Sequence, residues 1–297
     1  MHVTRWIKAG LAAMGAIVAI ATVSGSILEQ RARVRARRDI VMPGRLVDVE
    51  HGRRIQLDCR GSGSPTVVLE SGLDYLGSLS WVAVHDSIGR TTRVCAYSRA
   101  GLMWSDPDTE GFDGRRIARD LHTALTVASE AAPWVMVGHS LGGSYAMVFT
   151  QLFDADVGGM VLVDASHPDQ FSRYSEATGK DLQPSATAPR IGAALAWTGL
   201  VRMMSPPFPA SWSAAIGTTA SRLLPTSLGA LAEETAAVRS TLRQAGELRT
   251  LGDRPLIALT AALGPQPAEI AAMGLTPHEA DRLAVASRAL HEDQAMW

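Results

Sequence analysis

The stretch WVMVGHSLGG, from Trp134 to Gly143, decides the fold. Its first four residues are apolar, as in a buried strand, and the pattern Gly-x-Ser-x-Gly then leads into a helix. Gly138 and Gly142 leave space where a side chain would clash with the neighbouring strand or helix. Such a turn lifts a serine hydroxyl out of the backbone. Ser140 is therefore a candidate nucleophile, and it would need a histidine base and an acid.

The composition bounds the class of protein. The chain has 297 residues, 46% hydrophobic and 19% charged, with a net charge of -1. These values suit one folded domain with a large core and an appendage. A near-neutral balance of charge gives no reason to expect a nucleic-acid partner.

The appendage is an apolar N-terminal segment. Ala9 to Leu28 contains no charged residue, and about 20 apolar residues of helix cross a bilayer. We therefore divide this region into a tail (1–8), a transmembrane signal-anchor helix (9–28) and a basic linker (29–44). A cleaved signal peptide is the alternative, because Thr22 to Ser24 resembles a cleavage site, although the apolar run is longer than usual.

The remaining pattern predicts one α/β domain over 45–297. Apolar strands alternate with helices up to about residue 167, which is typical of a mainly parallel sheet covered on both faces. The segment 168–250 has no convincing strand and predicts a helical cap. It contains a Pro-rich stretch from Met203 to Pro209 and helical segments such as Leu228 to Leu248. Strand character returns at Pro255 to Thr260. A last helix begins at Pro277, with Thr276 as its N-cap, and runs to about Gln294.

Four motifs in order make the chain, from about Arg45 onward, resemble the α/β-hydrolase family. They are VLESGL (Val68–Leu73), YSRAGLMWS (Tyr97–Ser105), GHSLGG (Gly138–Gly143) and VLVD (Val161–Asp164). The resemblance implies a mainly parallel sheet with helices on both faces and a helical cap insertion. A haloalkane dehalogenase-like enzyme is disfavoured, because its nucleophile would be an aspartate at position 140.

The resemblance assigns roles to four residues. Ser140 would be the nucleophile, and the backbone N–H groups of Leu73 and Leu141 would form the oxyanion hole. The acid would be Asp164, at the end of the sixth strand, because no carboxylate follows the seventh strand until Glu269. A structural alternative for Asp164 is a cap on the following turn.

The family's catalytic histidine follows an eighth strand, which this sequence does not contain. We therefore expect a domain that lacks its last strand, loop and helix. His167, His278 and His291 stand at other positions. Without a base the serine would be a weak nucleophile, so a truncated, catalytically impaired or non-catalytic protein is the alternative to an enzyme.

Cys59 and Cys95 are the only cysteines. They could be two buried thiols that pack as small hydrophobes. The family's strand order places the second strand beside the fourth, and this implies a Cys59–Cys95 disulfide as the other interpretation. A disulfide would place the domain outside the cytoplasm. The five arginines between 31 and 38 argue for the opposite membrane face.

Together these features predict a single-pass, membrane-anchored serine hydrolase of the esterase type. It would cleave an ester, a lipid or a small amide by nucleophilic acyl transfer. The Trp-, Met- and Pro-containing cap favours an apolar small-molecule ester or amide. We expect no metal and no organic cofactor.

Overall fold

A seven-stranded sheet forms the centre of the protein. The computed structural model describes residues 2–205, 213–262 and 264–297. The strands follow in the order β1-β2-β4-β3-β5-β6-β7; β1 and β2 pair antiparallel, as do β2 and β4, and the other neighbours are parallel. They are β1 (Arg45–Asp48), β2 (Arg54–Arg60), β3 (Thr66–Glu70), β4 (Val94–Ser98), β5 (Trp134–His139), β6 (Val157–Val163) and β7 (Leu256–Leu259). The expected fold class is confirmed.

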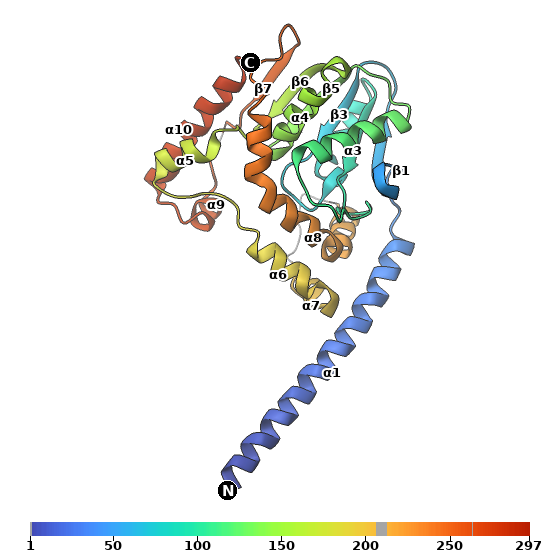
Figure 1. Cartoon of the computed structure of the whole chain (residues 1–297), viewed down its shortest axis with the longest axis vertical. Coiled ribbons are helices and arrows are strands. Elements are labelled where there is room, and N and C mark those ends of the chain that lie inside the picture. Colours follow the sequence, from blue (N-terminus) through green and yellow to red (C-terminus); the bar gives the residue numbers. More distant parts are fainter. Residues whose placement is uncertain (1, 206–212, 263) are drawn as a thin grey trace.

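Helices surround the sheet (Figure 1). The α-helices are α1 (His2–Asp39), α2 (His85–Gly89), α3 (Gly114–Val127), α4 (Leu141–Leu152), α5 (Gln170–Thr178), α6 (Thr187–Leu195), α7 (Leu200–Met204), α8 (Ala214–Ala245), α9 (Pro267–Ala272) and α10 (Pro277–Gln294). Short 3-10 turns are η1 (Glu50–Gly52), η2 (Gly77–Trp81), η3 (Asp154–Asp156) and η4 (Ala196–Thr198).

The two faces of the sheet carry different apolar clusters, because side chains alternate along each strand. Val68 and Cys95 belong to the main core, which they form with residues of α3 and α4 such as Leu121 and Met147. Their strand neighbours Leu69, Val94 and Ala96 face the other way, toward Trp81 of η2 and Ile88 of α2. The central strands are therefore buried on both sides.

The insertion after β6 is helical in its described part. Helices α6, α7 and α8 pack on one another, and α8 also lies against α3 and α4. Helix α8 begins at Ala214 and contains Pro225, so it extends further toward the N-terminus than the sequence pattern from Leu228 indicated. Residues 206–212, which include the predicted Pro-rich segment of the cap, lie outside the described residues.

The predicted last helix matches the structure at both ends. Helix α10 runs from Pro277 to Gln294, and Thr276 caps it with Glu279 in a reciprocal capping box. In the described chain β7 pairs with β6 alone, and its Ile257 and Leu259 are about half exposed at 53% and 52%. An apolar edge of this kind favours association with another strand or helix.

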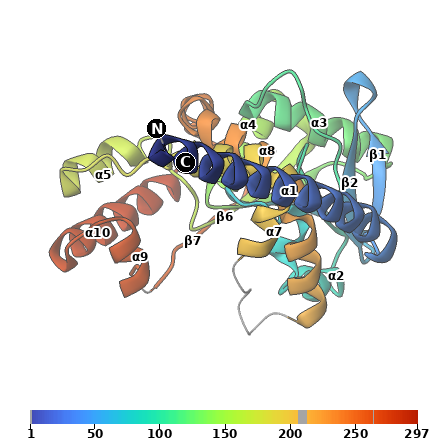
Figure 2. The same cartoon turned by 90° about the horizontal axis from the view of Figure 1, so that it is seen from below.

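Helix α1 is one continuous helix whose N-terminal part projects away from the body (Figure 1). Seen from below, it crosses in front of the domain (Figure 2), and its C-terminal part contacts η4 and α8. No break separates the apolar stretch from the arginines that follow it, so the predicted tail, span and linker share one helix as far as Asp39. Large apolar side chains between Trp6 and Leu28 are exposed. By length and composition, α1 is able to cross a membrane.

Strands β2 and β4 are joined by a disulfide. Cys59 and Cys95 stand directly opposite each other in the antiparallel register, with Cα atoms 4.0 Å apart, and their Sγ atoms are bonded. The bond closes a loop between residues separated by 36 positions. Loops of this size stabilise a fold by about 3–4 kcal/mol in the chain-entropy description.

We predict that the unreduced, denatured protein contains no free thiol and that the double variant Cys59→Ala/Cys95→Ala loses about 2–5 kcal/mol of unfolding free energy. Thiol titration with and without reductant, and urea unfolding, are the measurements. Two free thiols in the unreduced protein would contradict the disulfide.

Candidate active site

The turn at Ser140 has the strained geometry that its sequence predicts. Ser140 has φ +51° and ψ −126°, an unusual backbone conformation for a residue with a side chain, and its N–H donates to the carbonyl of Val163 at 3.1 Å. A Cβ atom on Gly138 would lie 2.5 Å from the Cα of Gly143, and one on Gly142 would lie 2.2 Å from the carbonyl oxygen of Glu70. These contacts explain both glycines.

The loop after β3 lies directly against Ser140. A Cβ atom on Gly72 would be 3.1 Å from the Cβ of Ser140. The carbonyl oxygens of Glu70 and Ser71 crowd Gly142 at the start of α4. Leu73 packs against Leu141 in a small apolar cluster that also includes Tyr145. The structure thus places Gly72, the residue before the expected donor Leu73, against Ser140, and the other expected donor, Leu141, follows Ser140 in the chain.

Arg99 holds this loop from behind. Its guanidinium donates to the carbonyl oxygens of Ser71 at 2.8 Å and Gly72 at 2.7 Å. It also binds the carboxylate of Glu70 at 2.8 Å and both oxygens of Glu234 at 2.9 Å. Glu234 belongs to α8, so one arginine ties the loop beside Ser140 to the cap.

This cluster is fully buried, and burial governs its protonation. The side chains of Glu70, Arg99 and Glu234 are at most 1% exposed. Burial raises the pKa of Glu70 to about 7 although Arg99 opposes the shift, and it raises the pKa of Glu234 in the same direction. Two carboxylates share one guanidinium. A proton on one of them therefore leaves the cluster neutral.

Asp164 stands where β6 ends, at the same sheet edge as Ser140. It adopts a left-handed backbone with φ +46°, and its N–H donates to the carbonyl of Leu259 at 2.7 Å. One carboxylate oxygen accepts from the N–H of Ala261 at 3.3 Å and lies 3.7 Å from Nδ1 of His291. A cavity of about 480 Å³ opens beside Asp164 between β7, α9 and α10.

The histidines near this edge are engaged elsewhere. Nε2 of His167 is 3.0 Å from a carboxylate oxygen of Asp293, and its Nδ1 accepts from the N–H of Asp169. Burial lowers the pKa of His167, against the effect of Asp293. His139 is exposed and meets the ring of Trp81 edge-on. Within the described residues, no imidazole makes a hydrogen bond with the hydroxyl of Ser140.

Two contacts of the site were not predicted from the sequence. His291 is 94% buried, and its Nδ1 faces Asp164 without a hydrogen-bond partner in the described chain. Glu234 closes the ion cluster from 135 residues beyond Arg99. A carboxylate on the apolar face of the cap helix could have indicated that Glu234 is buried and paired with a cation. No sequence pattern indicated that His291 lies beside Asp164.

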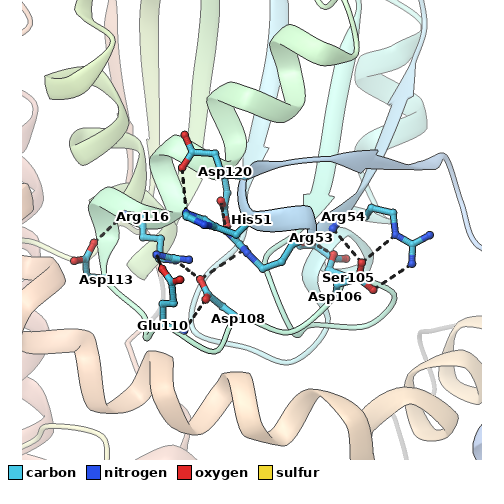
Figure 3. Close-up of polar contacts among 12 residues, drawn as sticks. His51, Arg53, Arg54, Ser105, Asp106, Asp108, Glu110, Asp113, Arg116 and Asp120 are labelled. Carbon is cyan, nitrogen blue, oxygen red and sulfur yellow. Dashed lines mark hydrogen bonds and ion pairs between the residues drawn. The ribbon is translucent and has the colours of Figure 1, made fainter.

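A second ionic network lies away from Ser140 and fixes the chain that follows β4 (Figure 3). Arg53 binds both carboxylate oxygens of Asp120 at 2.6 and 2.7 Å, and lies 3.6 Å from Asp108. Arg116 pairs with Asp108 and with Glu110. Each of these carboxylates forms an ion pair with an arginine. The network therefore connects the loop between β4 and α3 to α3 itself and to the β1–β2 hairpin.

One group of metal-ligating atoms occurs in the described chain, formed by Cys59, Cys95 and Glu130. Its two sulfur atoms are bonded to each other, and Glu130 accepts two hydrogen bonds from Arg93. A disulfide offers no thiolate, so these atoms do not suit a metal ion.

The sequence pattern of the Alpha/beta hydrolase family matches residues 51–296, and the chain belongs to this family. An uncharacterized protein of Schizosaccharomyces pombe is 32% identical, over 41% of this chain and 28% of that protein. An uncharacterized vacuolar membrane protein of Saccharomyces cerevisiae is 31% identical over 35% and 17%. The chain spans less than half the length of the curated relatives it matches.

Solved structures share the fold at low sequence identity. The Cif epoxide hydrolase from Acinetobacter nosocomialis has a TM-score of 0.57 at 14% identity, covering 79% of this chain and 80% of that one. A membrane phospholipase A described as a bacterial virulence factor has a TM-score of 0.51 at 16% identity, covering 91% and 87%.

We predict that Gly142→Ala costs about 3 kcal/mol or more of unfolding free energy, because the new methyl group would overlap the carbonyl oxygen of Glu70. Gly229→Ala in α8 is the matched control, since a Cβ atom there has no neighbour within 4 Å. It should stabilise the protein by about 0.5–1 kcal/mol through its helix propensity. Equal effects in the two variants would contradict the packing account.

We also predict that Glu70 makes a contribution to stability that falls as the pH rises. The contribution of Glu70 is complete below its unfolded pKa of 4.5 and is lost as the pH passes through about 7, because the folded state holds the proton more tightly. Urea unfolding between pH 4.5 and 8 measures the slope. Glu70→Gln should flatten it, while Glu233→Gln, on an exposed neighbour of Glu234, should not. An unchanged slope in Glu70→Gln would assign the pH dependence to other groups.

Proposed function

We propose that this protein is a serine hydrolase that cleaves an ester, a lipid or a small amide by acyl transfer to water through Ser140. The observation that carries the proposal is the contact between the turn at Ser140 and the loop at Gly72. The pair supplies a raised hydroxyl and a backbone loop at the same point, as acyl transfer requires. Serine rather than aspartate at position 140 favours an acyl-enzyme over an alkyl-enzyme intermediate.

The position of Arg99 supports Leu73 as an oxyanion donor. In a trans peptide the C=O and the following N–H point in opposite directions. The carbonyl of Gly72 points at Arg99, so the N–H of Leu73 points away from that guanidinium. Gly72 itself lies against Ser140. The N–H of Leu141, the residue after Ser140, is the second proposed donor.

Asp164 is the proposed acid, because it ends the strand whose last carbonyl binds the N–H of Ser140. The alternative function is a hydrolase-like protein that lacks the base histidine. Two observations favour this alternative: His167 is bound to Asp293, and His291 approaches Asp164 rather than the hydroxyl of Ser140.

Within this proposal the protein is anchored in a membrane by α1 and acts on an apolar substrate. Helix α1 has the length and composition of a span, and the chain is similar to a vacuolar membrane protein and, in fold, to a membrane phospholipase A. A thermophilic esterase from Thermogutta terrifontis is a further structural neighbour, with a TM-score of 0.50 at 17% identity over 83% of this chain and 94% of that one. Within this proposal the membrane face follows the disulfide, which suits an extracytoplasmic domain.

We predict that a fluorophosphonate probe labels the full chain at Ser140. Labelling should disappear in Ser140→Ala and persist in Ser144→Ala, because Ser144 sits one turn further along α4 with its hydroxyl bonded to the carbonyl of Ser166. Gel fluorescence and peptide mass spectrometry are the measurements.

Wild-type labelling no stronger than that of Ser140→Ala would contradict the active hydrolase and support the alternative. Where labelling occurs, Asp164→Asn and His291→Ala separate the roles at the sheet edge. A loss of labelling rate of about 100-fold or more is expected for Asp164→Asn if it serves as the acid. A similar loss in His291→Ala would identify His291 as its partner.

A further inference from the structure

A large cavity lies at the junction of α1, the cap and the chain after β4. Its volume is about 690 Å³. One wall is the end of α1 around Ala36 and Ile40, a second is the loop containing Met103 and Trp104, and α6, η4 and α8 close the rest. Neither Ser140 nor Asp164 lines it, so it is separate from the candidate active site.

The lining of this cavity is both basic and apolar. Four arginines and a single carboxylate face it in the described chain; they are Arg33, Arg37, Arg54, Arg222 and Asp106. Arg54 is paired with Asp106, and Arg33 is paired with Glu29. Arg37 and Arg222 make no salt bridge with a described carboxylate. A ligand here would meet two guanidinium groups that lie outside any salt bridge of the described chain, next to an apolar wall. The exposed carboxylate of Asp39 attracts Arg222 without a direct ion pair.

The cavity sits just beyond the apolar part of α1. The cap touches α1 at Gly25, where a Cβ atom would lie 2.1 Å from the carbonyl oxygen of Thr198 in η4. Arg202 of α7 binds both carboxylate oxygens of Glu29 at 2.7 and 3.1 Å. At 1.5 Å per helical residue, Arg33 and Arg37 lie roughly 7.5 and 13.5 Å past Leu28. The headgroup layer outside the bilayer core is about 5–8 Å deep, so Arg33 stands at its outer edge when the apolar run fills the core. Arg37 stands one turn further out, and helical side chains lean toward the N-terminus, which is the direction of the headgroups.

The part of the cap that contacts α1, namely η4 and the neighbouring α7, carries exposed apolar side chains. Trp197, Leu200, Met203 and Met204 are 54%, 44%, 86% and 73% exposed. Trp197 also lines the cavity, so the apolar surface continues into it. An amphiphile could place its chains along this surface and its charged group among the arginines.

We propose that this cavity binds one anionic phospholipid from the membrane that holds α1, with the phosphate between Arg37 and Arg222 and the acyl chains along the cap surface at Trp197. The proposal rests on the proposed membrane anchoring by α1, but not on catalysis at Ser140. The bound lipid would hold α1 and the cap together at the membrane surface.

The test uses the full chain purified in dodecyl maltoside, with phosphatidylglycerol or phosphatidylcholine added at equal mole fraction. Native mass spectrometry counts the bound lipids. We expect one phosphatidylglycerol per chain, held in preference to phosphatidylcholine. Arg37→Gln/Arg222→Gln should weaken it by roughly 30-fold, the effect of removing two cations from an anionic headgroup.

Two control comparisons distinguish specific lipid binding in the cavity from nonspecific electrostatic attraction of an anionic lipid to α1. Arg31→Gln/Arg35→Gln removes the same charge from residues of α1 that do not line the cavity, and it should change affinity by less than about threefold. Gly229→Leu places a side chain at a cavity-lining position where a Cβ atom meets nothing within 4 Å. It should reduce lipid binding without lowering the unfolding temperature, while Gly229→Ala should keep binding.

Equal retention of the two lipids, or an equal loss in both arginine pairs, would overturn the proposal. Binding of glycerol 3-phosphate as tight as that of the lipid would overturn the lipid source and assign a soluble anion. Membrane extraction of the full chain tests the anchoring by α1 separately from the lipid site. Release from membranes by alkaline carbonate without detergent would reject the anchoring itself, whereas retention with no lipid preference would reject only the site.

Discussion

The buried guanidinium of Arg99 is the interaction on which the arrangement of the site depends. An ion in the protein interior is stable only when its hydrogen-bonding groups are satisfied and its charge is compensated. Arg99 meets both conditions by binding Glu70 at the end of β3, Glu234 in α8 and the carbonyls of the loop between them. The sheet, the loop beside Ser140 and the cap are therefore fixed by one side chain. Loss of Arg99 would leave the carboxylates of Glu70 and Glu234 buried without their cation.

The sequence predicted the parts of this protein that depend on neighbours in the chain. The turn at Ser140 needs small residues at 138 and 142, and both glycines meet backbone atoms at distances that exclude a side chain. The last helix carries its own start signal at Thr276 and Glu279, so its limits were predicted correctly. The parallel sheet followed from apolar strands that alternate with helices, because such strands must be covered on both faces.

Contacts between distant segments could not be predicted in this way. Arg99 and Glu234 are separated by 135 positions, and no local pattern identifies which buried carboxylate forms an ion pair with a given arginine. The approach of His291 to Asp164 depends on how α10 packs against β7, which sequence periodicity does not determine. The sequence also did not show that α1 continues past Leu28 as one helix. A change from apolar to basic residues changes the polarity of a helix surface, but it does not mark a break in the helix.

The cap is attached to two different parts of the protein, the loop beside Ser140 and helix α1. Through Glu234 it binds Arg99 and the loop beside Ser140, and through Arg202 it binds Glu29 of α1. Helix α8 contacts both α1 and α4, the helix that follows the turn at Ser140. Because Glu234 belongs to the helix that contacts α1, a displacement of α1 that carries the cap with it would act on the carboxylate of Glu234. Glu234 in turn binds the guanidinium that holds the carbonyls of Ser71 and Gly72, so α1 and the loop at Ser140 are joined through a continuous series of contacts.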